Sequence, residues 1–205
     1  FIRNRNGECK YLNVLQGENF AQADDWYSQM KKFCDPKQYP DAHFNGWAMG
    51  GQNMCDIELA LKRLVELRHD GLLEEGLHDV MHFLGTSKLE WALVLTAVQR
   101  AVRKYHNPKF TVTFDCASPF LCTANGQFYT NWRLTGDKWS YMMNVGPDDK
   151  GFKGSGVLFD DVVRQMYPDF ISSPLSKHLT IDDICYYAPG DVSRMGTETK
   201  TSWDS

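Results

Sequence analysis

The chain has 205 residues, of which 42% are hydrophobic and 23% are charged, and its formal net charge is −4. This composition is typical of a globular protein and argues against a largely disordered chain. The negative charge gives no overall attraction for a polyanion, so a nucleic acid would need a local basic patch. No apolar run approaches the roughly 20 residues of a membrane span, and residues 1–6 contain no signal-peptide core, which predicts a cytoplasmic protein.

Four apolar segments that end in small or polar residues alternate with stretches of helical periodicity. We expect strands within 11–17, 44–51, 80–85 and 110–119, and helices over 19–33, 56–68 and 87–105. In the last helix, Ser87 is the expected N-cap and Glu90 completes a capping box. This order predicts parallel β/α units, whose active sites gather at the carboxyl ends of the strands.

The character of the sequence changes after residue 115, where it becomes aromatic, glycine-rich and irregular. Asn125-Gly126 predicts a hairpin turn, and the alternation of Trp132, Trp139 and Tyr141 predicts a small antiparallel element. A further helix is expected near 157–166, and a loosely ordered tail from Pro189 onward. We therefore expect one domain over 1–130 and an irregular α+β extension over 131–205.

Six cysteines are scattered along the chain without a C-x-x-C pair. Neither a zinc knuckle nor a dense disulfide framework is indicated by this spacing. Reduced thiols and no bound metal are the expectation.

Asp115 stands at the end of the segment Phe110-Thr-Val-Thr-Phe, which delivers its carboxylate into a Cys-Ala-Ser-Pro turn. A single Asp after a strand more often caps a turn or a following helix. At the carboxyl end of a strand in a β/α protein, however, a carboxylate is also suitably placed for catalysis. Both interpretations stay open on pattern alone.

A basic stretch precedes this strand and is the candidate nucleic-acid patch. It contains Arg100, Arg103, Lys104 and Lys109. The alternative is a solvated helix end, where cations interact favourably with the helix dipole.

The strand ends, taken in order, resemble the tRNA-guanine transglycosylase superfamily. That family replaces a guanine in a nucleic acid by a 7-deazaguanine base on a (β/α)8 barrel. The matching pieces are Val14-Leu-Gln-Gly17, Gly46-Trp-Ala-Met-Gly-Gly51, His82-Phe-Leu-Gly85, Phe114-Asp-Cys-Ala-Ser-Pro119 and Asn125-Gly-Gln127. The resemblance covers roughly residues 11 to 130.

The resemblance implies that Asp115 is the nucleophile that forms a covalent glycosyl enzyme. It implies that the substrate base is bound by Gln16, Gly50, Gly51, Gln52 and Leu84, with Gly51 acting through its backbone N–H. No redox or nucleotide cofactor is implied. Without the resemblance, an ordinary turn at Gly50-Gly51 and core packing of Leu84 are the expected roles.

The count of strands implies half of such a barrel, because a closed barrel has eight strands and about 250 residues. We expect a (β/α)8-type fold of which this chain supplies the C-terminal half, completed by another chain or by a segment that precedes it. The second catalytic carboxylate of the family has no counterpart in this half.

Two departures from the family favour DNA over tRNA as the substrate. Pro119-Phe120-Leu121 stands where the tRNA enzymes have P-T-R, and the zinc signature C-x-C-x-x-C is absent. In these two features the chain resembles the phage-type branch of the family, which inserts 7-deazaguanines into DNA. The alternatives are base exchange on tRNA, a non-catalytic nucleic-acid-binding subunit, and an unrelated barrel enzyme that acts on a small metabolite.

Overall fold

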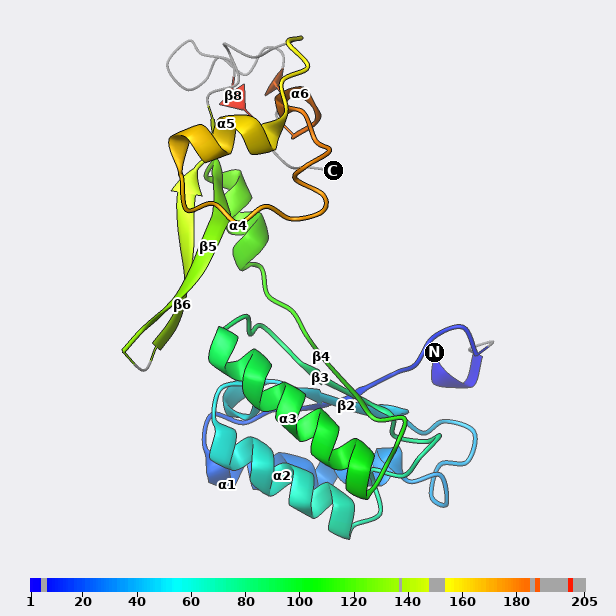
Figure 1. Ribbon diagram of the computed structural model, residues 1–205. Coiled ribbons are helices and arrows are strands. Elements are labelled where there is room, and N and C mark those ends of the chain that lie inside the picture. The colour runs from blue at the N-terminus through cyan, green and yellow to red at the C-terminus, as the bar shows by residue number, and fades with distance from the viewer. Residues whose placement is uncertain (5–6, 137, 148–153, 185–186, 189–198, 201–205) are drawn as a thin grey trace. The chain divides into compact units, whose positions relative to one another are not determined.

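The computed structural model describes residues 1–4, 7–136, 138–147, 154–184, 187–188 and 199–200. It divides the chain into two compact units, residues 1–116 and 117–205 (Figure 1). The sequence placed the division at residue 130, which lies inside a strand of the second unit. The structure places it directly after the last strand of the first unit, because the helix that follows contacts that later strand.

The first unit is an α/β structure in which strands and helices alternate. Its described elements are η1 (Ile2–Asn4), β1 (Asn13–Leu15), α1 (Phe20–Met30), η2 (Lys31–Cys34), β2 (Gly46–Met49), η3 (Gly51–Met54), α2 (Ile57–His69), β3 (Val80–Phe83), α3 (Leu89–Tyr105) and β4 (Thr111–Phe114). Within these residues the strands form one four-stranded parallel sheet in the order β1-β2-β3-β4. The alternation that the sequence predicts is confirmed.

Helices α1, α2 and α3 lie side by side on one face of this sheet (Figure 1). Right-handed crossovers between strands that are neighbours in both sequence and space put every helix on the same side. The core lies between the two layers and includes Leu15, Trp47, Met49, Met81 and Phe83 from the strands. Among the described residues of this unit, no α-helix covers the opposite face.

Side-chain caps fix the starts of two of these helices. The Asn19 side chain accepts a hydrogen bond from the Gln22 N–H, and Asp56 accepts one from the Leu59 N–H. The capping box predicted at Ser87 and Glu90 is wrong. Helix α3 begins at Leu89 after Lys88, without a side-chain cap. Glu90 is then the second helical residue, one position short of the one a capping box requires.

The second unit joins a helix to an antiparallel hairpin and a small core. Its described elements are α4 (Ser118–Ala124), β5 (Gln127–Thr135), β6 (Lys138–Val145), α5 (Phe159–Met166), α6 (Ile181–Ile184), β7 (Tyr187–Ala188) and β8 (Thr199–Lys200). The predicted antiparallel element and the helix near 157–166 are confirmed by β5, β6 and α5. Most of the predicted loose tail lies outside the described residues.

Asn125-Gly126 does not form the hairpin turn that the sequence predicted. It ends α4, where the Asn125 N–H donates to the Cys122 carbonyl at 3.0 Å and Gly126 has φ +67°. A glycine in this left-handed conformation suits a helix C-terminus as well as a hairpin. The hairpin instead turns between Thr135 and Lys138, which are paired in the register of β5 and β6.

Two further findings concern membrane-spanning helices and the cysteines. In the described part of the chain, no helix combines the length and the apolar character needed to cross a membrane. Cys9, Cys34, Cys55 and Cys122 are free thiols, and Cys116 is not part of a disulfide, whereas Cys185 lies outside the described residues.

Candidate active site

The sheet register brings four of the predicted site residues together at the carboxyl edge. The last paired row is Leu15, Met49, Phe83 and Phe114. Leu15, Met49 and Phe83 point into the core beneath the helices, so the residues that follow them face the uncovered side. The residues after this row are Gln16, Gly50, Leu84 and Asp115. We call these four residues the edge row.

Glycines at the β1 and β2 ends allow two backbone segments to approach closely. The Gly50 N–H donates to the Leu15 carbonyl at 2.8 Å, and the Gln52 N–H donates to the Gly17 carbonyl at 2.7 Å. Gly51 has φ +54°, and a Cβ there would lie 2.6 Å from the Gly17 carbonyl oxygen. Only glycine fits this conformation and this space without strain.

The Gln16 side chain lies directly over Gly50. A Cβ on Gly50 would lie 2.6 Å from Gln16 Nε2, so the missing side chain makes room for this amide. Gly51 is the first residue of η3, and a leading N–H of a helix has no acceptor within that helix. An amide side chain and a backbone N–H therefore lie close together at this end of the sheet.

Gln52, the remaining residue expected at the base, is engaged elsewhere. Its Nε2 donates at 3.4 Å to Oδ2 of Asp56, the N-cap of α2. The Leu59 backbone N–H, and then the Gln52 amide, hold the pKa of Asp56 below its usual range. Gln52 thus supports the start of α2, and the structure does not bring its amide into the edge row.

Asp115 has weak contacts, and both of them involve one carboxylate oxygen. Oδ1 lies 3.4 Å from His82 Nε2 and accepts the Gly85 N–H at 3.4 Å. The Asp115 side chain is 70% exposed. An ionised carboxylate held at one oxygen and open at the other can act as a nucleophile or stabilise a developing positive charge.

His82 is a site residue whose role the sequence did not reveal. It stands opposite Thr113 in the register of β3 and β4, and its Nδ1 lies 2.8 Å from Thr113 Oγ1. The available signal was the alternation in Val80–Phe83, where the polar His82 lies between the buried Met81 and Phe83. Its pairing with Asp115 depends on the strand register.

The basic residues predicted to bind nucleic acid do not lie beside Asp115. Arg100, Arg103 and Lys104 belong to the last turns of α3, and Lys109 follows that helix. Since α3 leads back to the start of β4, the last turns of this helix lie at the amino edge of the sheet (Figure 1).

Three of these four cations also have partners within the protein. Arg103 Nε donates to the Phe110 carbonyl at 2.6 Å, Lys109 pairs with Glu75 at 3.0 Å, and Lys104 lies over the Tyr105 ring. The Arg103 contact fastens the end of α3 to the start of β4. This arrangement supports the helix-end alternative for the basic stretch.

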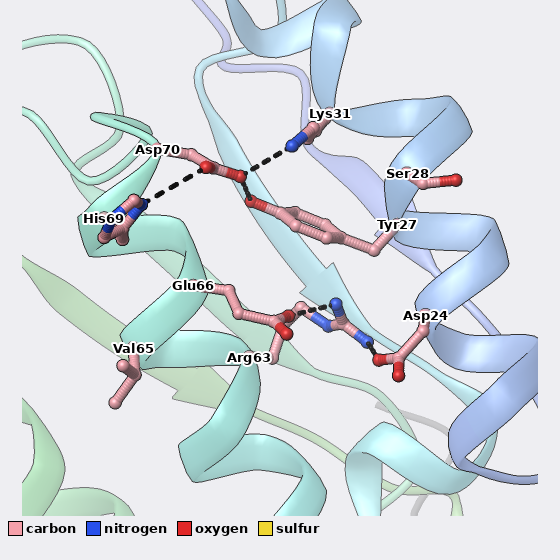
Figure 2. Close-up of a pocket in the computed structure, with 9 residues that line it drawn as sticks. All are labelled: Asp24, Tyr27, Ser28, Lys31, Arg63, Val65, Glu66, His69 and Asp70. Carbon is pink, nitrogen blue, oxygen red and sulfur yellow. Dashed lines mark hydrogen bonds and ion pairs between the residues drawn. The ribbon is translucent and has the colours of Figure 1, made fainter.

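A separate pocket of about 530 Å³ lies between α1 and α2 (Figure 2). The charged and phenolic groups that line it form what we call the α1/α2 charge cluster: Asp24, Tyr27, Lys31, Arg63, Glu66 and Asp70. Arg63 is buried and lies over the Tyr27 ring, 4.4 Å from its centroid.

Short hydrogen bonds join the members of this cluster. Arg63 donates to Asp24 at 2.8 Å and to Glu66 at 2.5 Å. Asp70 accepts from the Tyr27 hydroxyl at 2.7 Å and from Lys31 at 2.9 Å. Burial favours a raised pKa for Asp70, but the Tyr27 and Lys31 hydrogen bonds outweigh it and hold the pKa below its usual range. The cluster fastens α1 to α2.

The first unit is therefore an α/β structure whose edge row, with an amide and a carboxylate side chain, lies at the carboxyl edge of a parallel sheet. Comparisons of the chain with models of known families, with curated proteins and with solved structures found no match. Among the residues that the structure describes, no group of three or more His, Cys, Asp or Glu side chains is arranged to hold a metal ion.

Proposed function

We propose that the protein is a guanine transglycosylase that exchanges guanine for a 7-deazaguanine base in DNA, with Asp115 as the nucleophile. The observation that carries the proposal is the edge row. Gln16, Gly50, Leu84 and Asp115 come from four separate segments of the sequence and are neighbours across four parallel strands. These are the residues to which the family resemblance assigns the chemistry and the base.

The proposed reaction has two displacements at the sugar C1′. The free Oδ2 of Asp115 attacks C1′, and the C1′–N9 bond breaks with its electron pair leaving on guanine, which takes up a proton. N9 of the 7-deazaguanine then attacks C1′ and loses its proton, while the ester bond breaks and the Asp115 carboxylate is restored. A carboxylate suits both steps because it stabilises an oxocarbenium-like state and then bonds to it.

Gln16, Gly51 and Leu84 would recognise the base in this scheme. The Gln16 amide offers a donor and an acceptor to the polar edge of a purine or deazapurine, and the Gly51 N–H offers a second donor. Leu84 would pack on the ring. The target nucleotide must leave the base stack to reach Asp115, which costs a few kcal/mol. In this proposal the enzyme works in the cytoplasm without a metal or redox cofactor.

We further propose that the first unit is half of a (β/α)8 barrel completed by another chain or by another segment. The consecutive strand order and the single helix layer support this, and within the described residues β1 and β4 each pair on one side only. Unpaired edges favour association. A light-scattering mass well above 23.5 kDa would support completion by a second copy of the chain. A stable monomer with one cooperative unfolding transition would contradict the half-barrel.

The test of the activity is covalent trapping on a denaturing gel. The full chain is incubated with DNA or tRNA, with and without guanine or a 7-deazaguanine base, and compared with Asp115→Asn. Asp41→Asn is the matched control, because Asp41 is an exposed carboxylate in the loop before β2, away from the edge row. An adduct on DNA that Asp115→Asn abolishes and Asp41→Asn retains is the expected result.

The other outcomes separate the alternatives. An Asp115-dependent adduct on tRNA alone would assign the protein to the RNA enzymes, a choice against which Phe120 and Leu121 in place of the family's T-R argue. No adduct on either polymer would overturn the transglycosylase proposal and leave a binding subunit.

A further inference from the structure

We propose that His82 is a positioning residue for Asp115, which it holds through Oδ1 so that Oδ2 faces the sugar. This inference rests on the proposed function, because it gives His82 a task in that reaction. It concerns a contact that neither the sequence motifs nor the family resemblance assigned.

The contact joins two adjacent strands at the uncovered face of the sheet. His82 is in β3 opposite Thr113 of β4, and Asp115 follows two residues after Thr113. Because successive side chains of a strand alternate between faces, Thr113 and Asp115 point to the same side as His82. The ring therefore reaches Thr113 Oγ1 at 2.8 Å with Nδ1 and Asp115 Oδ1 at 3.4 Å with Nε2.

Nε2 lies 3.4 Å from Asp115 Oδ1, the distance of an ion-pair contact. Because an ionised carboxylate can only accept hydrogen bonds, we place the hydrogen of the ring on Nε2, where the contact is attractive. The Thr113 hydroxyl can donate or accept and adapts to Nδ1. Thr113 thus holds the ring in the orientation that presents Nε2–H to the carboxylate, as the partner of one imidazole nitrogen commonly does.

The contact with His82 would limit the rotation of the Asp115 side chain. Asp115 lies beyond the last paired residue of β4, and its side chain is 70% exposed. Free rotation would spread its oxygens over several directions, and attack at C1′ requires one of them in line. His82 is better enclosed, with 21% of its side chain exposed, so it can serve as a fixed support. The Gly85 N–H contacts the same oxygen.

The role is one of orientation, so the expected effect is on the rate of attack. Misplacing a reacting group by about 1 Å can cost roughly 100-fold, and we expect His82→Ala to slow adduct formation by about 10- to 100-fold. The apparent KM for the polynucleotide should stay unchanged. His82→Gln, whose amide can also donate to a carboxylate, should recover a substantial part of the rate.

The matched control is His69→Ala. His69 also faces a carboxylate, at 3.8 Å from Asp70, but it is 89% exposed on α2 and away from the edge row. It should leave the adduct rate unchanged. An equal loss of rate in His69→Ala and His82→Ala, or a wild-type rate in His82→Ala, would overturn the proposal.

A second readout tests the contact without any activity. In protein labelled with ¹⁵N-histidine, NMR should show His82 Nε2 protonated, and its signal should shift in Asp115→Asn. Thr113→Val should shift the Nδ1 signal. An unprotonated Nε2, or one insensitive to Asp115→Asn, would refute the positioning role even if adducts form. If the wild type forms no adduct, the proposed function fails, and the NMR result alone decides whether His82 holds Asp115.

Discussion

The α1/α2 charge cluster and the edge row both contain carboxylates, but they treat them in opposite ways. In the cluster, Asp24, Glu66 and Asp70 accept hydrogen bonds of 2.5–2.9 Å from cations. In the edge row, both contacts to Asp115 are 3.4 Å long and involve one oxygen. Short charge-assisted bonds stabilise a fold but leave a carboxylate a poor nucleophile. Incomplete pairing therefore distinguishes Asp115, the candidate reactive group, from the carboxylates of the cluster.

The same substitution, made in the edge row and in the cluster, tests this distinction most directly. Asp115→Asn should lower adduct formation by about 10⁴-fold or more, as expected for loss of a nucleophile. It should change the free energy of unfolding by no more than about 0.5 kcal/mol. Asp70→Asn should keep the adduct and lose about 1–2 kcal/mol of stability. Gel trapping and urea denaturation measure the two effects, and similar effects in both variants would remove the distinction.

Arg63 offers the next largest effect, on stability alone. Arg63→Met removes a guanidinium that is 1% exposed and leaves Asp24 and Glu66 without it. Complete burial would make the cost about 3–5 kcal/mol, but both carboxylates are about a third or more exposed, so we expect about 2–3 kcal/mol. The midpoints of urea denaturation, compared at a constant m-value, measure this loss of stability. The control Arg68→Met, on an exposed position of the same helix, should stay within about 0.5 kcal/mol.

The glycine turn can be tested by comparing two glycines with similar backbone conformations. Gly51 and Gly71 have φ of +54° and +70°, but a Cβ at Gly71 would meet nothing within 4 Å. Both alanine variants should lose about 1–2 kcal/mol from the left-handed conformation. Gly51→Ala should lose at least about 1 kcal/mol more, because its Cβ meets the Gly17 carbonyl. Equal losses of unfolding free energy in the two alanine variants would show that the close approach of Gly51 to Gly17 is not required at this edge.

The smallest expected effect is the acid dependence of the cluster. The pKa of Asp70 is held below its ordinary value of 3.8 in the folded protein. Its stabilising contribution is therefore complete above the unfolded pKa and is lost as pH falls below 3.8 through the lowered folded value. Tyr27→Phe, which removes one donor, should cost about 1 kcal/mol at pH 7 and less at low pH. A difference in unfolding free energy between the wild type and Tyr27→Phe that stays constant with pH would contradict this link between the Asp70 pKa and stability.

Most of the first unit could be predicted from local pattern. Apolar strands and amphipathic helices are signalled by neighbouring residues, and the predicted segments contain β1 to β4 and correspond to α1 to α3. The errors fell where two structures share one signal. Gly126 suits both a hairpin and a helix end, and the capping-box spacing at Ser87 failed because the helix begins after Lys88. A few neighbouring residues do not decide between a hairpin and a helix end, and they do not fix the residue at which a helix begins.

Only part of the candidate site could be predicted, because some of its contacts depend on more than neighbouring residues. The edge row follows from strand ends, which the sequence indicates. The His82–Asp115 contact depends on which residues of β3 and β4 stand opposite each other, and register is set by packing of the whole sheet. The basic stretch is visible in the sequence as a run of charged residues, but the location of its helical part at the amino edge follows from the direction of α3.

The consecutive order of the strands also bears on how the first unit folds. Each strand pairs with the strand before it in the chain, one β/α unit away, and none must wait for a distant segment. Contacts that are close in sequence speed folding, and elements can dock in the order of synthesis. Because β4 comes last in this order, Asp115 would be brought into place only after Gln16, Gly50 and Leu84 had reached their positions in the edge row.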